Sequence, residues 1–187
     1  MQVDALLNTL HVAERLKDAT RHCYTSGGRH ESVAEHSWRL ALLAFFLRDE
    51  FPELDMDKVI SMCLIHDLGE CFTGDIPTFL KTNSDTEKED DLLDRWVKTL
   101  PEPYCSDLTA LYAEMNALET GEAKLYKALD KLEAVIQHNE SPLDTWIPRE
   151  FELNIHYGED AAAFSPYLRQ LRAAVRRDTE QKIAEGK

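Results

Sequence analysis

His66 and Asp67 are adjacent in a segment that otherwise has the composition of a protein interior. Between Val59 and Cys71 most side chains are apolar, and burying an imidazole beside a carboxylate is strongly unfavourable unless another group compensates. A divalent cation compensates for both groups, because imidazole nitrogen and carboxylate oxygen are both good metal ligands. The pair therefore predicts a metal site.

Two more polar residues lie next to apolar helix faces. His36 shares a predicted face with three leucines, and Asp130 adjoins an apolar stripe. Taken alone, His36 has an ordinary interpretation as a hydrogen-bonded core histidine. A polar stripe such as Asp130, Glu133 and Gln137 is usually the solvated face of an amphipathic helix. Neither residue predicts a metal by itself.

The combination is more specific than its parts. Together the four residues supply two imidazoles and two carboxylates from three predicted helices. Such a set leaves positions open for water and substrate, which is the arrangement that a hydrolytic metal needs. We therefore predict one divalent transition metal at His36, His66, Asp67 and Asp130. Mn²⁺, Co²⁺, Fe²⁺ and Ni²⁺ all suit these donors.

Helices have to position these groups, because helical periodicity runs through nearly the whole chain and no segment alternates as a half-buried strand does. A capping box at Ser32–Glu35 begins the helix that carries His36. A second helix is predicted to begin near Asp55 and to carry His66 and Glu70 on one stripe. Further helices are predicted at about 6–17, 84–98, 108–118, 125–136 and 164–183, with 141–158 as a loop.

The length of 187 residues fits a single domain. The helices predict that residues 1–187 form one compact, all-α domain. Its motif-bearing core lies at about 6–137, and residues 138–187 add a loop and a closing C-terminal helix.

Composition excludes several classes of partner. Asp and Glu number 35 against 21 Lys and Arg, and the formal charge of −14 disfavours binding to nucleic-acid polymers or to a membrane surface. The uncharged run Leu40–Leu47 is too short to span a bilayer. The four cysteines form no CxxC pair, and the first residues lack the pattern of a secretory signal. We therefore predict free thiols and a cytoplasmic location.

Four segments fall in the order and spacing of a known family. They are Glu31-Ser-Val-Ala-Glu-His-Ser37, His66-Asp-Leu-Gly-Glu70, Thr73-Gly-Asp-Ile-Pro-Thr78 and Asp130-Lys-Leu-Glu133. In these segments the chain resembles the HD-domain metal-dependent phosphohydrolases, and among them the 5′-deoxynucleotidase branch. The resemblance covers about residues 6–137. It implies a helical HD-domain fold and the same four metal ligands.

The resemblance also implies roles around the metal. Glu70 corresponds to a residue that acts in acid–base steps near the attacking water, and Asp75 to one that accepts a hydrogen bond from the sugar hydroxyl. Arg21 corresponds to an arginine that binds phosphate, and Lys81, within the region that the resemblance covers and close to the third segment, is a candidate second cation. His22 stands where the best-studied pattern has a tryptophan that packs on the sugar, so the preference between deoxyribose and ribose is left open.

The implied activity is that of a 5′-nucleotidase that releases phosphate from (deoxy)ribonucleoside 5′-monophosphates, working as a homodimer. Three aromatic residues outside the motifs, Trp96, Trp146 and Tyr167, are expected either to be exposed and to serve such a dimer or to pack in the core.

Two alternatives remain open at this point. An HD-type oxygenase holds a di-iron pair through two extra histidines between the His-Asp pair and the last Asp. No histidine occurs from 68 to 129 here, and His138 comes too late, which favours a mononuclear site. A catalytically silent nucleotide-binding module is the other alternative. Its ligands would have no physical reason to remain as buried charges, so the intact set and Glu70 argue against it.

Overall fold

The computed structural model describes residues 1–186, and most of them are helical. The helices are α1 (Val3–Ala13), α2 (Val33–Phe46), α3 (Met56–Ile65), α4 (Glu70–Thr73), α5 (Asn83–Val97), α6 (Tyr104–Ala117), α7 (Gly121–Glu140), α8 (Glu150–His156), α9 (Glu159–Ala162) and α10 (Pro166–Glu185). Short 3-10 helices occupy Glu14–Lys17, Arg48–Glu50 and Leu143–Thr145, and the strands are β1 (Thr20–Tyr24) and β2 (His30–Ser32). The predicted all-α class is confirmed.

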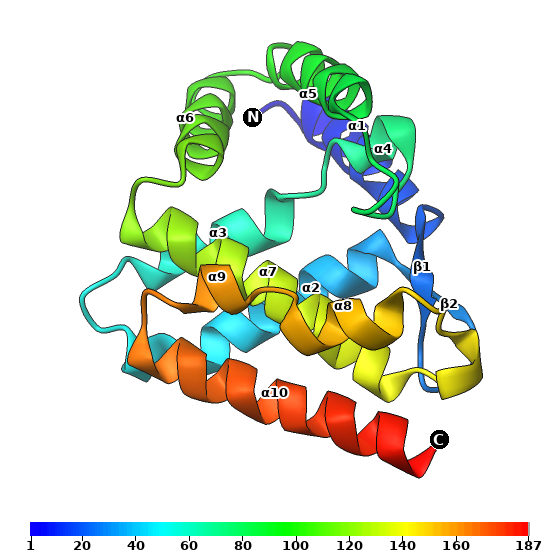
Figure 1. Ribbon diagram of the computed structural model, residues 1–187. Coiled ribbons are helices and arrows are strands. Elements are labelled where there is room, and N and C mark those ends of the chain that lie inside the picture. Colours follow the sequence, from blue (N-terminus) through cyan, green and yellow to red (C-terminus); the bar gives the residue numbers. More distant parts are fainter. Residues whose placement is uncertain (187) are drawn as a thin grey trace.

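The core forms where α2, α3 and α7 pack together, and α10 covers the outer side of α7 (Figure 1). Leu40, Met62, Leu125 and Leu132 are fully buried there. Along each of the three helices, buried positions recur every three or four residues, so each helix buries one face. In Figure 1, α5 and α6 stand at the top, at the opposite end from α10.

A two-stranded antiparallel hairpin is the one sheet in the described residues, and the sequence analysis missed it. Its strands are five and three residues long, and the register shifts between Thr20 and Tyr24. Strands this short and irregular show no clean alternation of apolar and polar residues. The hairpin lies against α7 and so places Arg21 and His22 beside that helix.

The helix that carries the His-Asp pair breaks where a continuous helix was predicted. α3 ends at Ile65, residues 66–69 form a turn, and α4 begins at Glu70. Side chains take up the carbonyls at this end: His66 Nδ1 donates to the Cys63 carbonyl at 2.9 Å, and the Tyr112 hydroxyl donates to the Ile65 carbonyl at 2.7 Å. These contacts replace the bonds of a further helical turn. Glu70 is therefore not on the same helix as His66.

One further expectation differs from the structure. The predicted loop at 141–158 contains a 3-10 helix and α8. Of the three aromatics considered as a dimer surface, Trp146 is buried, whereas Trp96 and Tyr167 are half-buried. None of the described helices combines the length and apolar composition required to cross a bilayer.

Candidate active site

The four predicted ligands converge from three parts of the chain. His36 comes from α2, His66 and Asp67 from the turn after α3, and Asp130 from α7. His36 Nε2 lies 3.2 Å from both His66 Nε2 and Asp130 Oδ1. His66 Nε2 lies 3.0 Å from Asp67 Oδ2 and 3.6 Å from Asp130 Oδ1. The structure thus brings together every residue predicted to bind the metal.

Hydrogen bonds on the far side of each imidazole fix which nitrogen faces the cluster. His36 Nδ1 donates to the Glu133 carboxylate, and His66 Nδ1 donates to the Cys63 carbonyl. Both Nε2 atoms then point into the cluster, where two carboxylates face them. A bound cation would take the place of the protons that otherwise lie between these groups, and imidazoles oriented through their second nitrogen are typical of metal sites. The donor set fits a divalent transition metal.

The electrostatics of the cluster favour positive charge. Burial opposes protonation of His66, but Asp67 and Asp130 outweigh burial and raise its pKa to about 10. Burial likewise opposes ionisation of Asp130, yet Lys127 and the two histidines hold its pKa well below the ordinary range. Carboxylates kept ionised next to imidazoles are what a bound cation requires.

Glu133 connects the cluster to two arginines, a role that the sequence analysis missed. Its buried carboxylate accepts hydrogen bonds from His36, from Arg39 Nε at 2.6 Å and from Arg21 Nη1 at 3.4 Å. The alternative interpretation of this stripe as a solvated helix face therefore does not apply to Glu133. The available signal was spacing, since Glu133 lies one helical turn after Asp130 and on the same face.

A cavity of about 400 Å³ opens over the cluster. Its lining includes His36, Asp67 and Asp130 of the metal cluster and all five of the other predicted residues, which are Arg21, His22, Glu70, Asp75 and Lys81. Arg29, two residues before the first matched segment, pairs with Glu35 at the surface, 2.5 Å away. The structure thus separates this arginine from the others.

Arg21 is held in the cavity wall by carboxylates on two sides. Its Nη1 atom donates to Glu31 at 3.0 Å as well as to Glu133. Lys81 is anchored similarly, with Nζ 2.7 Å from Glu89 Oε2. Both cations are therefore oriented before any ligand arrives.

Glu70, at the start of α4, is buried, and among the described residues its Oε2 has no hydrogen-bond partner. Burial, reinforced by Asp67 and Asp75, raises its pKa to about 9. The carboxyl is therefore protonated at neutral pH and can donate a proton. Asp75 follows Gly74, whose φ of 73° lies in the left-handed region that favours glycine, and this turn directs the chain along the cavity.

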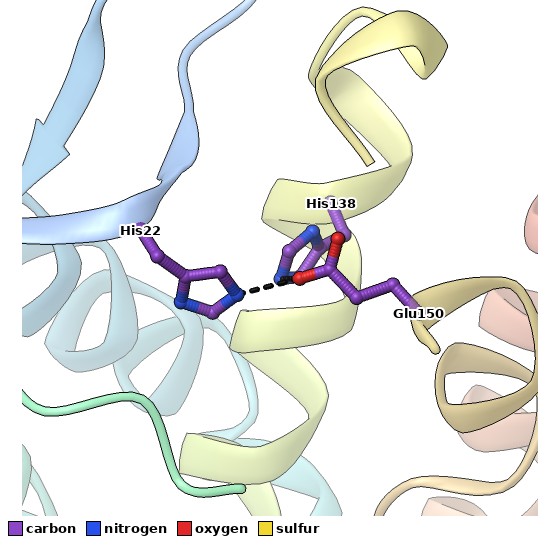
Figure 2. Close-up of side chains that lie close together, drawn as sticks. All are labelled: His22, His138 and Glu150. Carbon is purple, nitrogen blue, oxygen red and sulfur yellow. Dashed lines mark hydrogen bonds and ion pairs between the residues drawn. The ribbon is translucent and has the colours of Figure 1, made fainter. Parts of the chain in front are cut away.

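His22 is fixed on its outer side by a residue from the predicted loop. Its Nε2 donates to Glu150 Oε1 at 2.6 Å (Figure 2). Its ring also meets the ring of Phe79 edge to face at 5.3 Å. The ring thus occupies a defined place in the cavity wall.

A family model for the HD domain matches residues 13–172. The chain belongs to the HD-domain family. Among solved structures, this HD domain is similar to a predicted metal-dependent phosphohydrolase from Magnetospirillum magnetotacticum. The TM-score is 0.80 at 26% identity, covering 98% of this chain and 94% of that one. A conserved hypothetical protein from Pyrococcus furiosus gives a TM-score of 0.70 at 31% identity, covering 94% and 99%.

Curated relatives share the similarity. The 5′-deoxynucleotidase HDDC2 of Homo sapiens is 30% identical over 140 residues, which is 73% of this chain and 68% of the relative. HDDC2 of Xenopus laevis is 28% identical over 187 residues, covering 97% and 91%. The HD-domain fold predicted from the four motifs is confirmed, whereas the division at residue 137 stays a prediction.

Proposed function

We propose that this HD domain is a metal-dependent 5′-nucleotidase that hydrolyses (deoxy)ribonucleoside 5′-monophosphates to nucleoside and phosphate. The observation that carries the proposal is the convergence of His36, His66, Asp67 and Asp130 at a cavity that Arg21 also lines. The similarity to proteins named 5′-deoxynucleotidase supports the same reaction.

The four converging residues would hold one divalent transition ion, of which Mn²⁺, Co²⁺, Fe²⁺ and Ni²⁺ all suit the donors. When bound, such an ion acts as a Lewis acid on phosphate and lowers the pKa of water towards neutrality. Glu133 and the Cys63 carbonyl keep His36 and His66 in the tautomer that presents Nε2.

Arg21 binds the phosphate in this proposal. Its planar guanidinium suits a phosphate group, and the carboxylates of Glu31 and Glu133 hold it in the cavity wall. Lys81 supplies a second cation on the same cavity. Two cations and one metal suffice for a phosphate dianion, whereas a triphosphate would bring more negative charge to a protein already at −14.

The remaining residues act on the leaving group and the sugar. Glu70 carries a proton at neutral pH and delivers it to the 5′ oxygen of the departing nucleoside. Asp75 accepts a hydrogen bond from the 3′-hydroxyl. His22 lies at the sugar and, being smaller than tryptophan, leaves room for a 2′-hydroxyl.

A phosphate-release screen tests the proposal. Purified protein is incubated with nucleoside monophosphates, nucleoside triphosphates and generic phosphomonoesters, each with Mn²⁺, Co²⁺, Fe²⁺ or Ni²⁺. Nucleoside monophosphates should be cleaved fastest, and Asp130→Asn or a chelator should abolish phosphate release. Full activity after prolonged dialysis against chelator would overturn the metal-dependent reaction. Faster cleavage of triphosphates would overturn the choice of substrate.

We also propose that the protein works as a cytoplasmic homodimer. Trp38, Phe45 and Phe46 form exposed aromatic surface on α2, which supports a partner there. All four cysteines are unpaired, as in a reducing compartment. Light scattering at micromolar concentration tests the dimer, and a mass near 21.4 kDa would show a monomer.

A further inference from the structure

A second group of metal-ligating side chains lies on the wall of the same cavity (Figure 2). His22 comes from β1, His138 from the last turn of α7 and Glu150 from the start of α8. One ligand atom from each lies within 4.8 Å of the other two. These residues, here called the His22 cluster, are separate from the four that converge on Asp130.

His138 has no explanation as an ordinary buried histidine. It is 8% exposed, and its Nδ1 has no hydrogen-bond partner among the described residues. Its Nε2 lies 3.6 Å from Glu150 Oε1, which is too far for a hydrogen bond. Buried polar groups are almost always satisfied, so an imidazole left in this state indicates a missing partner.

The surroundings of His138 suit a metal as that partner. Burial lowers the pKa of His138, and the neutral imidazole is the form that binds metals. The backbone of His138 is fixed, because its carbonyl accepts hydrogen bonds from Ser141 Oγ at 2.8 Å and Trp146 Nε1 at 3.0 Å, and the ring lies edge to face on the Trp146 ring at 5.8 Å.

The other two residues are oriented towards the same point. Glu150 Oε2 accepts the Ile147 backbone N–H at 2.8 Å, which leaves Oε1 facing His22 and His138. The edge-to-face contact with Phe79 holds the His22 ring.

The charge around the His22 cluster also permits a cation. The nearby positive charge of Arg21 opposes a positive charge at His138. Arg21 itself pairs with Glu31 at 3.0 Å and Glu133 at 3.4 Å. These two carboxylates reduce the repulsion between Arg21 and a cation at the His22 cluster, while Glu150 contributes a negative charge at the cluster itself.

We propose that His22, His138 and Glu150 form a second metal site that takes Zn²⁺ or a similar divalent transition ion. Two imidazoles and one glutamate are a donor set that zinc uses, with a further position left for water or ligand. That position would open to the cavity that the three residues line. Metal binding at Nε2 breaks the hydrogen bond that His22 donates to Glu150 in the metal-free protein, and the ring proton moves from Nε2 to Nδ1. The site does not depend on the proposed nucleotidase activity.

Metal counting tests the site without any nucleotide. Wild type and variants are equilibrated with Zn²⁺, desalted and analysed for metal per chain by mass spectrometry. His138→Gln, Glu150→Gln and His22→Phe should each lose about one ion relative to wild type. His156→Gln, which changes an exposed histidine at the end of α8, should lose none. His22→Phe keeps an aromatic ring at a half-buried position, so it decides the result if the two buried variants unfold.

Cobalt spectroscopy identifies which of the two sites loses its ion. In a His66→Gln/Asp130→Asn background, Co²⁺ should still give the visible absorption of a four-coordinate site, and adding His138→Gln should abolish it. The proposal is overturned if that absorption survives His138→Gln, or if His22→Phe binds as many Zn²⁺ ions as wild type. If a variant of the His22 cluster loses nucleotidase activity but binds as many metal ions as wild type, the second metal site is overturned. The proposed reaction is then unaffected, because the wild type still carries it out.

Discussion

Replacing Glu133 by glutamine removes one buried negative charge while keeping the shape of the side chain. Glu133 accepts hydrogen bonds from three basic side chains, those of His36, Arg39 and Arg21. The amide oxygen of glutamine still accepts one of these bonds. The amide nitrogen is itself a donor, so it cannot accept from the basic groups that it faces. Arg21 and Arg39 then lose the buried carboxylate that balances them, and His36 loses the acceptor that fixes its tautomer.

The size of the effect follows from this geometry. Removing one partner of a buried ion pair is destabilising by roughly 3–5 kcal/mol, because the other charge stays buried and unpaired. For a protein of this size 1 kcal/mol corresponds to roughly 2–4 °C, so we expect the Tm to fall by roughly 6–20 °C. Removing the carboxylate that orients a ligating histidine should also weaken metal binding by roughly 10–100-fold.

Calorimetry of the metal-free protein and titration with Mn²⁺ measure the two effects separately. Glu140→Gln is the matched control, since this carboxylate also accepts from Arg39 but its side chain is 51% exposed. We expect it to change stability by no more than about 1 kcal/mol and to leave metal affinity unchanged. The reasoning is refuted if Glu133→Gln behaves like Glu140→Gln in both measurements.

Three further outcomes are expected. Glu70→Gln mimics the protonated carboxyl in shape but cannot release a proton, so phosphate release should fall by roughly 10²-fold or more at unchanged metal content; a loss of only a few-fold would make Glu70 a bystander. Wild type should cleave a 3′-deoxy monophosphate about 10²-fold more slowly than its parent, and Asp75→Asn should shrink that ratio; equal rates in wild type would remove Asp75 from sugar recognition. Burial raises the pKa of Cys23 to about 12 and that of Cys71 to about 11. At pH 8 a disulfide reagent should therefore react first with the half-buried Cys105, and with the other three thiols only after unfolding. Rapid reaction of all four thiols would show that the core opens readily.

The convergence of the four candidate metal ligands was predictable from sequence because these residues are costly to bury. An imidazole or a carboxylate on an apolar helix face needs a compensating partner, and His36, His66, Asp67 and Asp130 all stand in such positions. The helices that carry them were equally predictable. Local signals such as the capping box at Ser32–Glu35 act within one turn, and the structure forms that box.

The break after α3 could not be read from the same signals. The periodicity from Val59 to Cys71 is helical throughout, yet Tyr112 donates to the Ile65 carbonyl from a helix 47 residues further along. That contact exists only after α6 has packed against the end of α3. Tertiary packing therefore overrides local propensity there and moves Glu70 onto a helix of its own.

The sequence by itself determined the helical class, the acidic surface and the residue types able to hold a metal, because composition, periodicity and caps act over short stretches of chain. Only the tertiary structure decided which polar groups meet. Glu133 bonds His36 across 97 residues, and His22 bonds Glu150 across 128. The neighbouring sequence of a buried carboxylate with so distant a partner looks the same as that of a carboxylate on the solvated surface. The role of such a carboxylate is set by the burial and the partner that folding provides.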